Sequence, residues 1–315
     1  MSLHPVVTAE QELEEVHSDV VGRGPWALAW RRLRADRVAM GSLAVVVLMV
    51  LIAVFAPVFA HITGHPPNMQ YHQAGLTPDG LPKAPNSTFW LGTDDLGRDI
   101  LVRIAYGARI SLGVGVVATL LTVVVGVVLG LLAGFLGGFV DLVIARLVDL
   151  VLSIPFLLVA IALVSVSGPS LTITVLVISM FSWASMARIV RGQVLFLKER
   201  EFVEAARSLG ASDLRIMFVD VLPNVLAPVI VYTTLLIPVV IIVQATLSFL
   251  GLGLPAPAAD WGGMISEAQN YYTVAWWFVL FPSLALLITT IAFNLLGDGV
   301  RDAVDPRIDR LVRPR

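Results

Sequence analysis

The sequence predicts an all-α integral membrane protein with six transmembrane helices and with both termini in the cytoplasm. Of its 315 residues, 57% are hydrophobic and 14% are charged, whereas soluble domains have about 25% charged residues. A helix that spans a membrane needs about 20 apolar residues, and the chain contains several charge-free runs of that length. Lysines and arginines gather between these runs, and such clusters indicate the cytoplasmic ends of spans.

The first predicted element is a cytoplasmic N-terminal region at 1–37, which begins with an acidic and polar arm at 1–24. The rest of it is basic and amphipathic, and it contains Trp26 and Trp30. This composition predicts a helix at the headgroup level that faces anionic membrane lipid. The first span follows at 38–60, and its apolar run is too long for a signal peptide.

An irregular extracytoplasmic loop is predicted at 61–108, because five prolines interrupt its sequence before residue 86. Its last part merges into the stretch 91–109, LGTDDLGRDILVRIAYGAR. We expect a short outer helix there, leading directly into the second span.

The second span is predicted at 110–140, a run long enough to tilt in the membrane. The next charge-free run, 150–187, is too long for one helix. The sequence Ser-Gly-Pro-Ser at 167–170 divides it, since glycine and proline interrupt helices. We therefore expect the third and fourth spans at 142–166 and 171–187.

The fifth and sixth spans are predicted at 224–250 and 271–296. A five-helix core at 109–297 then contains one long polar loop at 191–222. The chain ends in a cytoplasmic tail at 298–315.

Orientation follows from the distribution of positive charge. Sixteen of the 21 lysines and arginines lie before the first span, between the fourth and fifth spans, or after the sixth span. Only four lie in or next to the loop 61–108. The positive-inside rule places the three richer clusters in the cytoplasm.

The polar loop contains the most informative stretch, EFVEAARSLGASDLRIMFVDVLPN at 201–224. One interpretation is an ordinary amphipathic connector, in which Gly210 caps a helix and Pro223 begins the next. Those structural roles do not exclude a function. Glu204-Ala205-Ala206, with Gly210 after three further residues, resembles the "EAA" signature of ABC-importer permeases.

From about residue 26 onward the chain resembles the dipeptide/oligopeptide class of ABC-importer permeases, and specifically their C-type subunit. Four further stretches carry this resemblance: 31–57, 91–112, 248–262 and 293–308. One departure is Asp220, where the family often has a basic or imidazole residue shortly before Leu-Pro-Asn. The resemblance implies a type I importer fold.

The resemblance also implies a function: with a paired homologous permease, the chain forms a path through the bacterial inner membrane for dipeptides or oligopeptides. An extracytoplasmic binding protein delivers them, and two ATPase subunits supply energy from ATP and Mg²⁺. The chain itself then binds no cofactor and is not an enzyme. A coupling helix at 205–216 would lie on the ATPase. The residues assigned to this contact are Glu204, Ala205, Ala206, Arg207, Gly210, Ser212, Asp213 and Arg215.

Other chemistry finds little support in the sequence. There is no cysteine, all five histidines precede residue 73, and no nucleotide-binding or zinc-binding motif is present. We expect no catalytic residue, no metal and no nucleic-acid partner. The alternative function is an ion-coupled secondary transporter, which would need charges deep in the membrane and usually internal repeats.

The only charges near the third span are Asp141, Arg146 and Asp149. Arg146 and Asp149 are three residues apart and can pair on one helix face. We interpret them as structural, and a functional role stays open.

Two polar residues in the predicted spans are candidates for lining the path: Gln244 in the fifth and Asn294 in the sixth. Either one can instead bond across helices. Pro155 lies within the third span and predicts a kink. Close helix packing is predicted at the glycines 126, 130, 134, 137 and 138, against this chain or the partner permease. The substrate stays open among dipeptides, longer peptides, nickel complexes and glycans.

Overall fold

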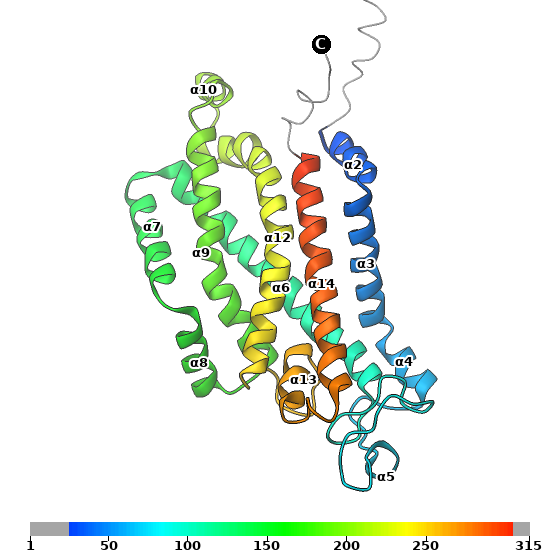
Figure 1. Ribbon diagram of the computed structural model, residues 1–315. Helices are drawn as coiled ribbons and strands as arrows, with labels where there is room; N and C mark the ends of the chain where they lie inside the picture. The colour runs from blue at the N-terminus through cyan, green and yellow to red at the C-terminus, as the bar shows by residue number, and fades with distance from the viewer. Residues whose placement is uncertain (1–24, 305–315) are drawn as a thin grey trace, which may run out of the picture.

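The computed structural model describes residues 25–304, and this part of the chain folds into helices joined by loops, without a β-strand (Figure 1). The predicted arm 1–24 and the end of the predicted tail, 305–315, lie outside the described residues. The helices are α2 (Pro25–Ala35), α3 (Arg37–Val54), α4 (Ala56–Thr63), α5 (His72–Gly75), α6 (Ile100–Leu136), α7 (Gly138–Ser153), α8 (Phe156–Ser167), α9 (Leu171–Leu197), α10 (Glu201–Ser208), α11 (Asp213–Arg215), the π-helix η1 (Ile216–Val221), α12 (Leu222–Phe249), α13 (Trp261–Glu267), the 3₁₀-helix η2 (Ala268–Asn270) and α14 (Trp276–Val304).

Five helical stretches in the described residues are long and apolar enough to cross a membrane. They are α3, α6, α9, α14 and the continuous stretch Asp213–Phe249, which ends with α12. A sixth is the pair α7 and α8, whose axes are bent by 85°. The described residues thus contain five candidate spans, and the predicted number of six is reached when the bent pair counts as one broken span.

The break lies between Ser153 and Phe156, where the sequence predicts only a kink at Pro155. Ile154 adopts an extended conformation, with φ −92° and ψ 129°. The ring of a following proline disfavours the helical conformation at this position. The continuous third span predicted at 142–166 is thus two half-helices.

The long helix α6 begins later than its predicted outer helix. The Asp99 side chain accepts hydrogen bonds from the N–H groups of Leu101 and Val102, and so caps the helix start. Residues 91–99 form a loop, so the predicted helix at 91–109 is wrong in its first half. From Ile100 the helix continues without interruption for 37 residues.

The glycines of α6 pack against α9 of the same chain. A Cβ atom added at Gly126, Gly130 or Gly134 would lie 2.5–2.7 Å from atoms of α9. These distances leave no room for a side chain, so the two helices touch at their backbones. Gly137 and Gly138 instead have φ values of 68° and 54° and form the turn into α7.

The two ends of the bundle differ in composition. In Figure 1, α2, α10 and the C-terminal end of α14 lie at one end, whereas α4, α5 and α13 lie at the other. The described residues of the three basic clusters therefore share one end. The prolines of 61–90 lie at the opposite end, in the loops around α5.

Candidate functional site

One largely exposed element at the basic end is the segment 201–221, which we call the α10 loop. It consists of α10, a turn, the short helix α11 and the π-helix η1. The predicted coupling helix at 205–216 is therefore wrong as a single helix, because the chain turns near Gly210. The predicted loop 191–222 also begins inside α9, which continues to Leu197.

The turn has the hydrogen bonds of a Schellman motif. The Gly210 N–H donates to the Arg207 carbonyl at 2.9 Å, and the Ala211 N–H donates to the Ala206 carbonyl at 3.1 Å. Gly210 has φ +81°, a conformation that favours glycine. The backbone itself therefore fixes the direction in which the chain leaves α10.

One side of the α10 loop is anchored in the core of the protein. Val203, Ile216 and Val221 are completely buried, and Met217 is nearly so. They pack in one cluster with apolar residues of α6 and α9. A displacement of this loop must therefore move those helices or break the cluster.

The other side of the loop exposes large apolar side chains. Leu209 is 88% exposed and Leu214 is 66% exposed. Apolar groups ringed by charges are typical of a protein-docking surface. Of the predicted coupling residues, Ala206 is half-buried, and the following are exposed: Glu204, Ala205, Arg207, Gly210, Ser212, Asp213 and Arg215.

The charges around these leucines are available to a partner. Within residues 25–304, none of Glu204, Arg207, Asp213 and Arg215 forms an ion pair. The Arg207 guanidinium carbon lies 6.0 Å from the centre of the Phe135 ring, so α6 supports its side chain.

Ion pairs near the α10 loop connect α7 to α9. Arg191 binds Asp141, with 2.7 Å between Nη2 and Oδ2. Arg188 binds Asp149 at 3.0 Å, and the predicted Arg146–Asp149 pair is present at 3.7 Å. Sequence reasoning missed the arginines of α9, because their partners are about 40 to 50 residues away.

The two candidate path residues lie in different surroundings. Gln244 is 2% exposed, and its amide donates to Ser248 Oγ at 3.0 Å and to Asp260 Oδ1 at 3.1 Å. It thus ties α12 to the residue that precedes α13. Asn294 is exposed on α14 and donates to the Thr290 carbonyl at 2.9 Å.

A buried charge network at the opposite end was not predicted. Arg98 and Arg103 bind Glu267 of α13 at 2.9 and 3.3 Å, and both also bind Asp94. Burial raises the pKa of Glu267, and likewise that of Asp95 beside it. The sequence showed only the aspartates and arginines of this stretch. Their partner Glu267 was missed because it is 169 residues from Arg98.

Two family profiles match this chain. The profile described as "Binding-protein-dependent transport system inner membrane component" matches residues 126–310. The profile described as "N-terminal TM domain of oligopeptide transport permease C" matches residues 24–78.

Curated relatives are similar along nearly their whole length. The dipeptide transport system permease protein DppC of Alkalihalophilus pseudofirmus is 38% identical over 304 residues, or 96% of this chain and 97% of the relative. The oligopeptide transport system permease protein OppC of Bacillus subtilis is 41% identical over 90% of each chain. The glutathione transport system permease protein GsiD of Escherichia coli O157:H7 is 41% identical over 91% of this chain and 92% of the relative.

Solved structures share the fold at lower sequence identity. The MetNI methionine ABC transporter, in an inward-facing conformation, matches with a TM-score of 0.52 and 18% identity, over 64% of this chain and 96% of that chain. An amino acid ABC transporter solved with histidines matches with a TM-score of 0.51 and 18% identity, over 64% and 93%.

Proposed function

Because this chain belongs to the binding-protein-dependent transport permease family, we propose that its α10 loop is the surface on which ATPase subunits act. As a family member, the chain is a permease subunit of an ABC importer and an integral protein of the inner membrane. None of these similarities supports the alternative of an ion-coupled secondary transporter.

The observation that carries the proposal is the pair of exposed leucines, Leu209 and Leu214, on a loop whose other side is anchored in the core. Burying a leucine stabilises a contact by about 1.5–3 kcal/mol. A partner that covers these two leucines binds the permease more tightly. The same partner also contacts a loop that is packed on α6 and α9. ATP shifts the permease only if its two conformations contact the ATPase differently.

The complete transporter, in this proposal, contains a paired homologous permease, two ATP-binding subunits and an extracytoplasmic binding protein. ATP and Mg²⁺ bind to the ATPase subunits, and this chain binds neither. The substrate is a peptide. Support comes from relatives that are named for dipeptide, oligopeptide and glutathione transport.

The orientation proposed here places the α10 loop and both chain ends in the cytoplasm and 61–108 outside. The shared position of α2, α10 and the end of α14 supports it (Figure 1). We retain the five-helix core at 109–297, with the N-terminal region at 1–37 and the tail at 298–315 as separate cytoplasmic parts.

Co-purification of the ATPase subunits with the permease tests the docking role. Leu209→Ser and Leu214→Ser should each weaken ATPase binding about 10- to 100-fold, since each removes one buried leucine from the contact. Leu81→Ser is the control, because Leu81 is an exposed leucine at the opposite end of the bundle. If both α10-loop variants retain the ATPase and normal peptide-stimulated ATP hydrolysis, the loop is not the docking surface.

A further inference from the structure

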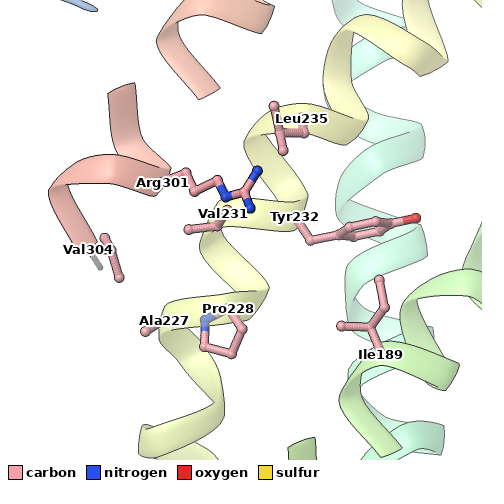
Figure 2. Close-up of a pocket in the computed structure, with 8 residues that line it drawn as sticks. All are labelled: Ile189, Ala227, Pro228, Val231, Tyr232, Leu235, Arg301 and Val304. Atoms are coloured by element: carbon pink, nitrogen blue, oxygen red, sulfur yellow. The ribbon is translucent and has the colours of Figure 1, made fainter. Parts of the chain in front are cut away.

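Two cavities adjoin α12, and Tyr232 lines both of them. The first has a volume of about 390 Å³ and lies between α9, α12 and α14 (Figure 2). The second, of about 400 Å³, lies beside the broken span formed by α7 and α8. We call the two together the α12 groove. Its lining residues on α12 range from Ala227 to Val243, and Arg301 and Val304 line it at the C-terminal end of α14.

The first cavity combines apolar walls with one positive charge. Its lining residues are Ile189, Ala227, Pro228, Val231, Tyr232, Leu235, Arg301 and Val304. Figure 2 shows the Arg301 side chain extending from α14 toward α12, near Val231. The Arg301 side chain is exposed and forms no ion pair with the other residues of 25–304. Its guanidinium is therefore available to an anion in the groove.

The second cavity offers hydroxyl groups at the middle of the spans. Ser182, Ser185 and Tyr232 contribute to its lining, and Tyr232 lies next to Ser185. Ile154, in the extended break between the two half-helices, also lines it. Irregular backbone at membrane depth is stable only where protein buries it or where it faces a polar cavity. The break therefore fits a groove that takes up polar molecules.

We propose that the α12 groove is a peptide-binding surface on the transport path, in which Arg301 binds the peptide's C-terminal carboxylate. The hydroxyls of Ser182, Ser185 and Tyr232 then bond to peptide amide groups, and the apolar walls accept peptide side chains. This inference rests on the proposed function of peptide import, and it names the part of the chain that meets the substrate.

Size and chemistry favour a short peptide over other occupants. Cavities that bind small ligands typically have volumes of about 300–1,000 Å³. An anionic lipid would satisfy Arg301, but its acyl chains would make no hydrogen bonds to the hydroxyls of Ser182, Ser185 and Tyr232. A peptide with a free carboxylate satisfies all of these groups.

The first test compares arginine variants in the complete transporter, reconstituted in liposomes with its binding protein and ATP. Arg301→Gln should slow uptake of radiolabelled dialanine about tenfold or more, because a hydrogen bond to a charged group is lost. Arg301→Lys keeps the charge and should recover part of the rate. Arg146→Gln is the matched control and should transport at the wild-type rate, since Arg146 is 76% exposed and lies outside the groove.

The second test uses single cysteines, since the native chain has none. Ala227→Cys and Ser185→Cys should react with a water-soluble methanethiosulfonate during ATP turnover, and dialanine should protect both. Val124→Cys, on the exposed apolar surface of α6, should react in neither condition.

Each contrary result has a separate meaning. If groove cysteines never react, or if only cardiolipin protects them, a partner helix or a lipid fills the groove and the inference is wrong. It is equally wrong if Arg301→Gln transports dialanine at the wild-type rate. If the wild-type complex imports no peptide at all with ATP, the proposed function fails instead.

Discussion

The turn at Gly210 allows the coupling proposal to be tested by backbone strain alone. Gly210 has φ +81°, and a Cβ added there meets no atom within 4 Å. A substitution therefore costs only the strain of a left-handed conformation, about 1–2 kcal/mol for an ordinary L-residue. Asparagine tolerates this conformation best and β-branched residues tolerate it least. The strain should increase in the order Gly210→Asn, Gly210→Ala, Gly210→Val.

A strain of 1–2 kcal/mol lowers the ratio of native to rearranged turns by a factor of about 5–30. The apparent affinity for the ATPase should fall by up to the same factor, because only the native turn presents the docking surface. Peptide-stimulated ATP hydrolysis, measured against ATPase concentration, should weaken in the same order.

Gly192→Ala is the control for this series. Gly192 lies in α9 near the same end, has no positive φ, and also has an open Cβ position. Alanine should leave coupling intact there, because it favours a helix over glycine by about 0.5–1 kcal/mol. The reasoning is refuted if Gly210→Val couples as well as Gly210→Asn, or if Gly192→Ala is equally damaging.

Three further predictions concern packing, pH and orientation. Gly130→Ala should lower the melting temperature of the complex relative to Gly113→Ala in the same helix, because a Cβ at Gly130 would lie 2.6 Å from a backbone oxygen and one at Gly113 would meet no atom within 4 Å. The expected loss of stability is about 1–3 kcal/mol. Equal melting temperatures of the two variants would contradict this prediction. Burial raises the pKa of Glu267 above its ordinary 4.5, so the folded protein holds that proton more tightly than the unfolded chain. Stability should then decrease as the pH rises from 4.5 through the raised pKa, and Glu267→Gln should flatten this slope in melting curves. In intact cells, an impermeant thiol reagent should label a cysteine at Ser87 and not one at Ser212; the reverse pattern would invert the proposed orientation.

Much of the fold could be predicted because its signals are local. Charge-free runs indicate spans by composition alone. The boundary between α8 and α9 is also local: Gly168 has φ +81°, and the Ser170 side chain accepts a hydrogen bond from the Ile173 N–H. Pro223, in the first turn of α12, was predicted for the same reason.

The features that could not be predicted depend on contacts between residues far apart in the sequence. A proline such as Pro155 is compatible with either a kink or a full break, and only the packing of α7 and α8 on α9 decides between them. The ion pair between Arg98 and Glu267 joins residues that are 169 positions apart. The charged, helix-prone sequence around Glu204 forms the exposed helix α10, as local information suggests. The prediction that Gly210 caps a helix is confirmed by its φ of +81° and by the Schellman hydrogen bonds. The single coupling helix at 205–216 is wrong because the chain turns at that glycine.

The broken span also affects how the protein is made. With a rise of 1.5 Å per residue, α7 and α8, of 16 and 12 residues, extend about 24 and 18 Å. Neither crosses a hydrocarbon core of about 30 Å by itself. The segment must therefore enter the bilayer as a pair, and its unpaired backbone groups near Ile154 need cover from α9. Since α9 emerges later from the ribosome, stable insertion of this broken span awaits synthesis of its neighbour. Changes that weaken α9 should then appear first as failed biogenesis, before any loss of transport.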